Sequence, residues 1–363
     1  MLNKPNVPVI AIEEHYSDPE LLARFTGRDS FAPPHVLKAL DDTGEARLKD
    51  MDACGIDVQV LSHTAPSLQK VSDDAVELAR RVNDRLAEIV KREPKRYAGF
   101  AALPTSDPAA AADELARCVE KLGFKGAMIH GLAHGHFIDD QRYWPIFARA
   151  AALDVPIYLH PSMPHEAVID AYYKEYAKDY PVLLRAAWGF TVETATLAIR
   201  LVLSGLFEQH NTKFILGHLG EGLPFLLWRI NNGLARPGQK PVAFRDIFSA
   251  HFSVTTSGFF SDPALLLCVQ ELGIDRILFT VDYPFEANAP GLPGCRRCRC
   301  ATRTRPRSRA AMRSGCCGCE ACICALSPLY CERRASHPQQ PPGVAARDLG
   351  LVLVAQRHRL QPG

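Results

Sequence analysis

Short apolar runs alternate with longer segments of helical periodicity along most of the chain. The runs are almost continuously apolar, which is typical of parallel strands that are covered on both faces. The segments between them repeat apolar residues every three to four positions, and several begin with acidic residues or an Asp-Pro pair. The predicted strands cover residues 9–12, 58–62, 97–102, 126–129, 156–159, 213–217, 252–255 and 277–281, and the predicted helices cover 73–92, 107–121, 143–152, 193–204, 221–233 and 262–272.

Eight strands with intervening helices predict an α/β fold, a (β/α)8 barrel of the TIM type. A doubly wound parallel sheet is the structural alternative. It would need a nucleotide or phosphate loop, and neither a G-x-G-x-x-G after a strand nor a P-loop occurs. The connection 163–188 is long and rich in Tyr. On a barrel it would lie over the catalytic mouth as a lid or pack against a neighbouring subunit.

Residues 288–363 differ in composition from everything before them. They contain 13 Arg, no Lys and three acidic residues, and nine of the 12 Cys lie between Cys295 and Cys331. Because the whole chain has 42 basic and 40 acidic residues, residues 1–287 have 29 basic and 37 acidic ones. We therefore predict a barrel over 1–287 and a separate Arg/Cys/Pro-rich tail over 288–363.

The tail shows neither helical nor strand periodicity where the last barrel helix should occur, so we expect that helix to be missing or replaced. Arg without Lys, among many Ala, Pro, Gly and Cys residues, is typical of GC-rich DNA translated in the wrong frame. A disordered extension and a zinc-binding module are the alternatives. The Cys spacings suit a metal, but the Cys pairs lack the loop separation of a zinc ribbon or finger.

The net charge of +2 does not indicate nucleic acid as a partner. We expect no apolar run to reach the length of roughly 18–20 residues that spans a bilayer, and the first residues lack a secretory apolar region. Only Cys54, Cys118 and Cys268 lie in the barrel segment, which agrees with a reducing compartment. We therefore expect a cytoplasmic protein that binds neither nucleic acid nor membrane.

Candidate metal ligands occur at the end of the first predicted strand, in Glu13-Glu14-His15. Residues two apart in a strand point to the same face, so Glu13 and His15 can both enter the barrel mouth while Glu14 points away. A carboxylate with an imidazole suits zinc, manganese or a similar divalent ion. Taken alone the triplet is weak evidence, because such a sequence is more often a surface segment.

Further candidates follow three other strands. His160 and His218 come directly after buried apolar runs, and Asp282 follows the last strand. Each has an ordinary alternative, a core histidine or an Asp that caps the turn before Pro284. In a barrel, however, the carboxyl ends of the strands converge on one pocket, and the last strand adjoins the first. Together these residues predict a shared metal site.

The sequence resembles the amidohydrolase-related family of metal-dependent decarboxylases, and most closely the branch of γ-resorcylate, 2,3-dihydroxybenzoate and 5-carboxyvanillate decarboxylases. The resemblance spans residues 9–287. The long GHLGEGLPFLLWRI run and the AAWGF…ETA…R segment are specific to this branch, whereas the E-x-H pattern indicates only the wider superfamily. The similar motifs are IAIEEHY, RLKDMDACGIDVQVLS, YLHP, AAWGFTVETATLAIRLVLSGLFEQH, FILGHLGEGLPFLLWRIN and ILFTVDYPFE.

The resemblance implies roles for individual residues. His218 and Glu221 resemble the family's catalytic pair beside the metal. Arg229 resembles a contact to the substrate carboxylate, in some relatives within a neighbouring subunit's site, and Arg47 is a second candidate for that contact. The residues that resemble its metal ligands are Glu13, His15, His160 and Asp282. Other histidines near strand ends match no family ligand and are interpreted as pocket lining or surface, namely His63, His130, His134 and His136.

The expected activity is non-oxidative decarboxylation of a hydroxybenzoate-type acid with one divalent ion, Zn or Mn with Mg as a further option. One ion is favoured over two because the fourth strand, GAMIHG, lacks the Lys of binuclear hydrolases. Asp282 is the candidate proton donor, and His218, oriented by Glu221, is the competing donor or a relay. Relatives imply a homo-oligomer, a dimer or tetramer. Alternatives are a metal-dependent hydrolase or hydratase of a small carboxylic acid, and an inactive truncated product.

Overall fold

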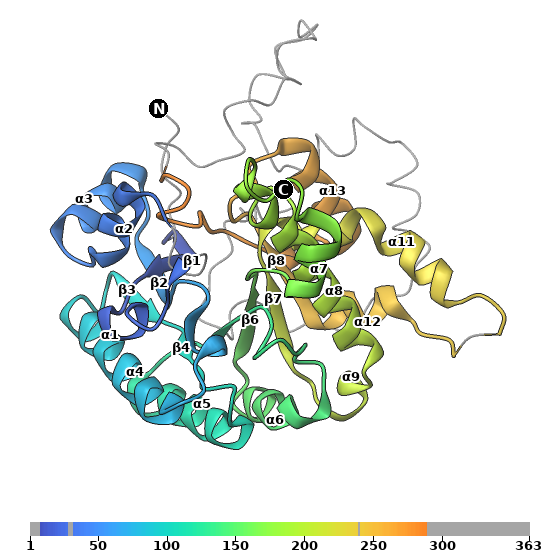
Figure 1. Ribbon diagram of the computed structural model, residues 1–363, viewed down its shortest axis with the longest axis horizontal. Helices are drawn as coiled ribbons and strands as arrows, with labels where there is room; N and C mark the ends of the chain where they lie inside the picture. The colour runs from blue at the N-terminus through green and yellow to red at the C-terminus, as the bar shows by residue number, and fades with distance from the viewer. Residues whose placement is uncertain (1–7, 28–31, 239, 289–363) are drawn as a thin grey trace, which may run out of the picture.

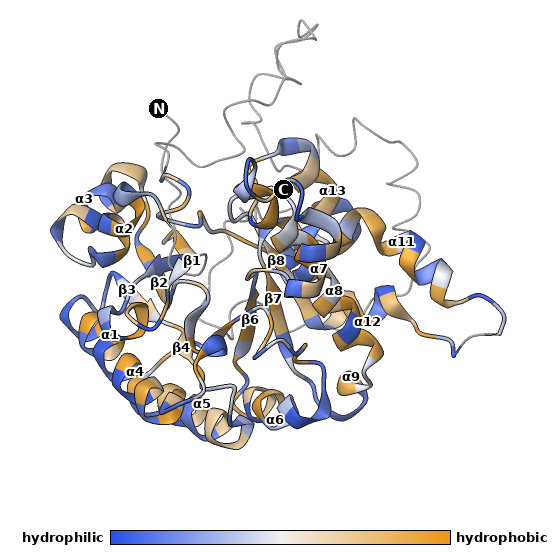
Figure 2. Ribbon diagram, in the orientation of Figure 1, coloured by the Kyte–Doolittle hydropathy of each residue, from blue (hydrophilic) through white to orange (hydrophobic). Residues whose placement is uncertain are grey.

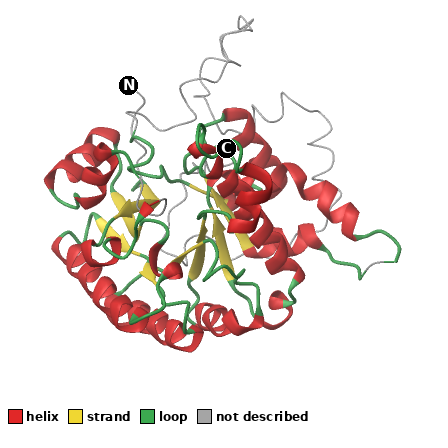
Figure 3. Ribbon diagram, viewed as in Figure 1, coloured by secondary structure: helices red, strands yellow, loops and turns green. Residues whose placement is uncertain are grey.

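The computed structural model describes residues 8–27, 32–238 and 240–288, in which parallel strands lie at the centre and helices surround them (Figures 1 and 3). All the predicted strands are present, with some ends shifted. The strands are β1 (Ile10–Tyr16), β2 (Val58–His63), β3 (Tyr97–Gly99), β4 (Ala101–Ala102), β5 (Ala127–His130), β6 (Pro156–His160), β7 (Lys213–Leu216), β8 (Phe252–Thr255) and β9 (Ile277–Leu278).

Neighbouring strands pair in parallel in the order β1-β2-β3 and β4-β5-β6-β7-β8-β9. The predicted strand 97–102 is divided at Phe100, where the chain changes partner. Phe100 N donates to Leu61 O at 2.9 Å on one side, and Ala101 N donates to Gly126 O at 2.9 Å on the other. β3 and β4 are therefore successive halves of one barrel strand.

The first strand, β1, and the segment that follows the last strand, β9, meet at the carboxyl end of β1. Glu14 forms a parallel bridge with Tyr283, and His15 N donates to Tyr283 O at 2.7 Å. One buried cluster also takes an apolar side chain from nearly every strand, as the interior layer of a barrel does. This arrangement confirms the predicted TIM-type fold. The layer contains Ile12, Val60, Phe100, Met128, Tyr158, Ile215 and Leu278.

A larger apolar cluster fills the space between the strands and the helices, and most apolar residues lie in the strands and on helix sides (Figure 2). The predicted helices are present. The helices of the described residues are α1 (Pro19–Leu22), α2 (Pro34–Asp41), α3 (Glu45–Cys54), α4 (Ala75–Arg92), α5 (Pro108–Leu122), α6 (Trp144–Ala152), α7 (Glu166–Val168), α8 (Gly189–Leu203), α9 (Leu206–Gln209), α10 (His218–Glu221), α11 (Leu223–Leu234), α12 (Phe244–His251) and α13 (Asp262–Leu272).

Helix α3 was not among the predicted helices, and its composition explains why. Its inward side holds Arg47 and Met51, both buried. An arginine thus occupies a position where helical periodicity expects an apolar residue. The last described residue, Asn288, lies against this helix, since its Nδ2 donates to Asp50 Oδ2 at 2.7 Å. The predicted tail and the fate of the last barrel helix fall on residues after Asn288, outside the described part.

The Tyr-rich connection contains short turns of helix, α7, the π-helical η4 (Ile169–Tyr173) and the 3-10 helix η5 (Pro181–Leu184). By length and composition, the stretch Pro181–Leu203 could cross a membrane, which corrects the expectation that no segment is apolar enough. The stretch is η5 joined to α8, and α8 contributes Leu197 and Leu201 to the main core. A core helix passes the same test, so this is weak evidence for a membrane span.

Candidate metal centre

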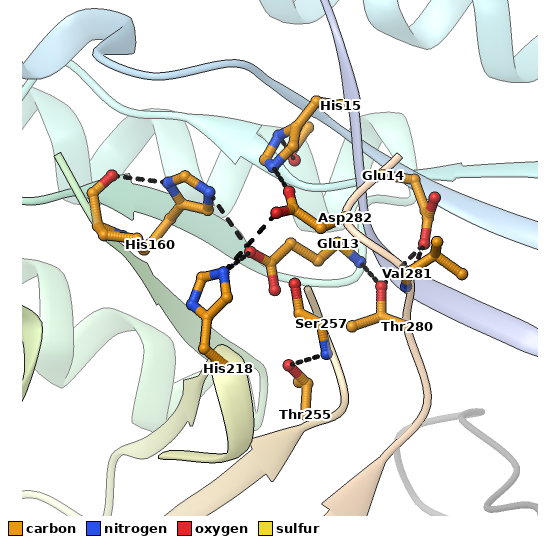
Figure 4. Close-up of polar contacts among 12 residues, drawn as sticks. Glu13, Glu14, His15, His160, His218, Thr255, Ser257, Thr280, Val281 and Asp282 are labelled. Carbon is orange, nitrogen blue, oxygen red and sulfur yellow. Dashed lines mark hydrogen bonds and ion pairs between the residues drawn. The ribbon is translucent and has the colours of Figure 1, made fainter. Parts of the chain in front are cut away.

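The carboxyl end of β1 places Glu13 and His15 on one side of the strand and Glu14 on the other, as predicted (Figure 4). β1 pairs with β2 through a register shift between Ala11 and Glu14. Hydrogen bonds to the segment after β9 hold this part of β1 in place. Glu13 N donates to the Thr280 hydroxyl at 2.6 Å, next to the bond from His15 to Tyr283.

Four side chains from three parts of the chain converge at this point, namely Glu13, His15, His160 and Asp282. Each offers one ligand atom, and these atoms all lie within 4.8 Å of one another. His15 Nε2 is 3.3 Å from Asp282 Oδ1, and His160 Nε2 is 3.3 Å from Glu13 Oε1. The structure therefore brings together the whole predicted ligand set.

Hydrogen bonds turn both histidines so that Nε2 faces the cluster. His160 Nδ1 lies 2.7 Å from Pro161 O, and His15 Nδ1 lies 3.2 Å from Ser62 Oγ. A metal-binding histidine commonly has its second nitrogen fixed in this way. The Tyr158 hydroxyl, two residues before His160, donates to Glu13 Oε2. Tyr158 was not among the predicted site residues, although its spacing of two from His160 places both side chains inside the barrel.

His218 lies beside the cluster, oriented by Glu221 through a contact of 2.7 Å between His218 Nδ1 and Glu221 Oε1. His218 Nε2 is 3.7 Å from Asp282 Oδ2 and 3.9 Å from Glu13 Oε1. A Cβ on Gly258, whose φ is +56°, would lie 3.2 Å from His218 Cδ2 and 3.3 Å from Asp282 Oδ2. This close approach of Gly258 leaves room for the two side chains to face each other.

The cluster is open on the side of His218 and Asp282. Their side chains are 20% and 14% exposed, whereas those of Glu13 and His15 are fully buried. Asp282 and His218 also have positive φ angles of 78° and 50°. Strained backbone of this kind in non-glycine residues concentrates at functional sites. A substrate would therefore approach from the side of these two residues.

Burial and neighbouring charges set the protonation of the cluster. Burial raises the pKa of Glu13 well above its ordinary value, although positive charge on His218 opposes this. Burial lowers the pKa of His160 well below its ordinary value, and His15 lowers it further. For His218 burial acts to lower the pKa, but the Glu221 and Glu13 carboxylates outweigh it and raise the pKa well above normal. His160 is therefore neutral, the form that ligates a metal.

The pKa of Asp282 is shifted in the opposite direction from that of Glu13. Burial acts to raise its pKa, but the neighbouring imidazoles of His15 and His218 outweigh burial and hold the pKa of Asp282 below its ordinary value. The carboxylate is therefore charged. An ionised carboxylate is the form in which Asp282 can serve as a metal ligand.

The donor set fits a divalent ion. Glu13 Oε1, His15 Nε2 and Asp282 Oδ1 are buried and have no hydrogen-bond partner among the described residues. Buried polar atoms normally find partners, so three that face one another indicate a site for a metal ion. Two carboxylates with two imidazoles suit zinc or manganese better than magnesium, which prefers oxygen ligands.

The two predicted substrate contacts lie elsewhere. Arg47 is fully buried behind β1, where its Nη2 donates to His15 O at 2.8 Å and its Nε to Gln59 Oε1 at 2.7 Å. These contacts argue against a role for Arg47 in binding substrate. Arg229 is on the exposed side of α11 next to Trp228, which is 66% exposed. The described structure does not bring Arg229 into the cluster of its own chain.

The remaining strand-end histidines lie as expected. His63 and His130 are buried, and His134 and His136 are exposed. The His130 ring centroid is 4.8 Å from that of His160, so His130 is packed against a candidate ligand. Neither nitrogen of His130 has a hydrogen-bond partner in the described part of the chain.

Comparison with known proteins agrees with this site. Residues 31–297 match the sequence profile of the amidohydrolase family. The chain is 42% identical over 295 residues to γ-resorcylate decarboxylase of Rhizobium sp. (strain MTP-10005), covering 76% of this chain and 88% of the relative. It therefore belongs to the amidohydrolase family.

Solved structures extend the likeness. Dihydroxybenzoic acid decarboxylase of Polaromonas sp. JS666, with bound manganese and the inhibitor 2-nitroresorcinol, is 41% identical with a TM-score of 0.69, covering 77% of this chain and 87% of that one. The 5-carboxyvanillate decarboxylase of Novosphingobium aromaticivorans, complexed with manganese and 4-hydroxy-3-methoxy-5-nitrobenzoic acid, is 30% identical with a TM-score of 0.71, covering 78% and 88%. These relatives confirm the family resemblance drawn from the sequence.

Proposed function

We propose that this protein catalyses the manganese-dependent, non-oxidative decarboxylation of a dihydroxybenzoate such as 2,6-dihydroxybenzoate. The observation that supports this most is the set of four ligand atoms within 4.8 Å of one another, open on the side of His218 and Asp282. The similar decarboxylases at 41–42% identity act on this class of acid. Manganese is preferred to zinc because manganese is bound in the similar structures.

A bound divalent ion would supply Lewis acidity and a fixed point for the substrate's carboxylate and adjacent phenolate oxygens. Glu13, His15, His160 and Asp282 would hold that ion. The protein must then deliver a proton to the ring carbon that bears the carboxylate. When that carbon is protonated the C–C bond breaks, CO2 leaves, and the electron pair restores the aromatic ring.

Asp282 is the proposed proton donor, once its resting carboxylate has taken up a proton, because its side chain lies at the open side of the cluster. His218 Nε2 at 3.7 Å from Asp282 Oδ2 is placed to pass a proton to Asp282. The bond from Glu221 keeps the imidazole of His218 in that orientation. A donor must lie within hydrogen-bond reach of the carbon it protonates, which Asp282 can satisfy only for a substrate at this side of the cluster.

The direct test incubates the purified protein with Mn²⁺ and 2,6-dihydroxybenzoate in D2O. We expect CO2 and resorcinol with one deuterium at the carbon that lost CO2, and a chelator should abolish both. A hydratase or hydrolase would instead incorporate solvent oxygen. A product that contains solvent oxygen, or a metal-loaded protein that releases no CO2 from any hydroxybenzoate, would refute the proposal.

We also propose that the chain forms a homo-oligomer through α11 and the Tyr-rich connection. Phe225 and Trp228 on α11 are 75% and 66% exposed, and Tyr172 in the connection is 72% exposed. Large apolar side chains exposed in this number are typical of interfaces. Arg229 would then contact substrate in a neighbouring subunit. Sedimentation should show a dimer or tetramer, and a monomer at micromolar concentration would exclude both ideas.

We further propose a catalytic unit that ends near residue 287 and a cytoplasmic location. The change in charge and Cys content at residue 288 supports the boundary. The cysteines of the described residues, Cys54, Cys118 and Cys268, are all unpaired, as in a reducing compartment. The coding DNA around codon 288 tests the boundary, because a one-base shift that restores an amphipathic helix would identify a frameshift.

A further inference from the structure

The outward side of the Glu13–His15 segment carries a second set of buried polar groups, separate from the metal ligands. Glu14 is fully buried, and both of its carboxylate oxygens accept hydrogen bonds. Oε1 accepts from the Thr280 hydroxyl at 2.8 Å and from Val281 N at 3.0 Å. Oε2 accepts from Gln59 Nε2 at 3.1 Å. Glu14 thus joins β1 to the segment that ends the barrel, 267 positions further along the chain.

These bonds continue through Gln59 to Arg47. Gln59 Oε1 accepts from Arg47 Nε at 2.7 Å, and Arg47 Nη2 donates to His15 O at 2.8 Å. The hydrogen bonds through Gln59 run from Arg47 towards Glu14. Arg47 only donates, the Gln59 amide both accepts and donates, and Glu14 only accepts. We name Arg47, Gln59 and Glu14 the Glu14 relay.

The contacts of the relay lie on both sides of Asp282. Glu14 holds Val281 N on one side. On the other side His15 N donates to Tyr283 O at 2.7 Å, and the Arg47 guanidinium lies 4.7 Å from the centre of the Tyr283 ring. Asp282 between them has a φ of +78°, a conformation that a non-glycine residue keeps only when its surroundings impose it.

We propose that Glu14 is a positioning residue, which through the Glu14 relay holds Asp282 opposite Glu13 and His15 and so sets the affinity of the metal centre without touching the ion. The inference rests on the proposed metal site. Metal-ligating residues depend on outer partners for their orientation, and loss of such a partner typically lowers metal affinity by about 10–100-fold.

The test exchanges the donor and the acceptor of the hydrogen bond between Gln59 and Glu14. Glu14→Gln alone turns an acceptor into a donor that faces Gln59 Nε2, and turning the Gln59 amide over only moves the conflict to Arg47. Adding Gln59→Glu removes the conflict. The new amide at position 14 then donates to the new carboxylate at position 59, and that carboxylate accepts from Arg47. The amide oxygen at position 14 still accepts from Thr280 and Val281.

The measurement is the dissociation constant for Mn²⁺, from the EPR signal of the free ion, with no substrate present. We expect E14Q to weaken Mn²⁺ binding about 10–100-fold, and the double variant E14Q/Q59E to bind within about threefold of the wild type. The matched control is Glu114→Gln, a buried carboxylate on α5 that accepts from Asn83 at 2.8 Å and from Arg117. It should lose stability but keep its Mn²⁺ affinity.

Wild-type affinity in E14Q, or a folded double variant that binds as weakly as E14Q, would overturn the proposal. If E14Q does not fold, Thr280→Val replaces it, since the Thr280 hydroxyl links Glu13 N to Glu14. Unchanged Mn²⁺ affinity in that variant would equally overturn it. A wild type that binds Mn²⁺ but releases no CO2 would refute the proposed decarboxylase activity alone, because the Glu14 test measures only metal binding.

Discussion

The two sides of strand β1 at Glu13, Glu14 and His15 are equally buried but differ in how their polar atoms are satisfied. On the inward side, Glu13 Oε1 and His15 Nε2 have no hydrogen-bond partner in the described structure. On the outward side, both carboxylate oxygens of Glu14 accept hydrogen bonds. Unpartnered buried atoms that converge indicate a ligand site, whereas a fully bonded buried charge indicates a support. Of these three successive residues, Glu13 and His15 thus offer ligand atoms for the metal, whereas Glu14 positions the site.

The largest effect is expected on the inward side, from Asp282→Asn. This variant keeps the size of the side chain but removes the proposed proton donor. General acid catalysis typically contributes about 10²–10⁴-fold, so kcat should fall by at least about 100-fold while some Mn²⁺ still binds. Steady-state CO2 release measures this. Asp154→Asn is the control, because Asp154 pairs with Lys213 at the amino ends of β6 and β7, away from the metal ligands. Near-normal turnover in D282N would reject the assigned role.

A smaller but clear effect is expected on the outward side, from Arg47→Met. The change leaves Gln59 Oε1 and the His15 carbonyl without their donor, and each buried acceptor left without a partner costs about 1–3 kcal/mol of unfolding free energy. Urea denaturation measures it. Arg149→Met removes an exposed pair with Asp113 and should cost less than about 1 kcal/mol. Equal losses of unfolding free energy in R47M and R149M would show that the Glu14 relay contributes no particular stability.

The smallest effect is expected from Tyr158→Phe, which removes one support on the inward side. The Tyr158 hydroxyl donates to Glu13 Oε2 and lies 3.1 Å from Thr255 Oγ1. We expect Mn²⁺ affinity to fall by no more than about tenfold and stability by about 1.5–3 kcal/mol. Tyr97→Phe is the control, since the Tyr97 hydroxyl is buried without a partner among the described residues. If Y158F and Y97F behaved alike, the bond to Glu13 would be irrelevant to the site.

The sequence predicted the strands and the ligand set because both depend on local pattern. Apolar runs that end in Glu13, His15, His160 or Asp282 specify a strand and its carboxyl end together, and the barrel then brings those ends to one pocket. The direction of Glu14 followed from the alternation of side chains in a strand. The hydrogen-bond partners of Glu14 could not be predicted in this way. Thr280 and Val281 are 266 and 267 positions away, and their contact with Glu14 depends on barrel closure.

Arg47 and Arg229 show a different limit of prediction from the sequence. Arg47 was interpreted as a substrate contact only because its place before the DMDACGID motif resembles that of the family. It is buried because Gln59 and the His15 carbonyl satisfy its guanidinium, which no periodicity could reveal. Arg229 is exposed within one chain, so its role depends on a neighbouring subunit and not on this fold.

The central claim is that four side chains from distant parts of the chain share one cation. The most direct measurement is the Mn²⁺ stoichiometry of the wild type and of His160→Ala, by equilibrium titration. We predict one tightly bound ion per chain in the wild type, and affinity reduced by more than about 100-fold in the variant, beyond the range of outer supports. Unchanged tight binding in H160A, or two equivalent ions per chain, would contradict the shared site.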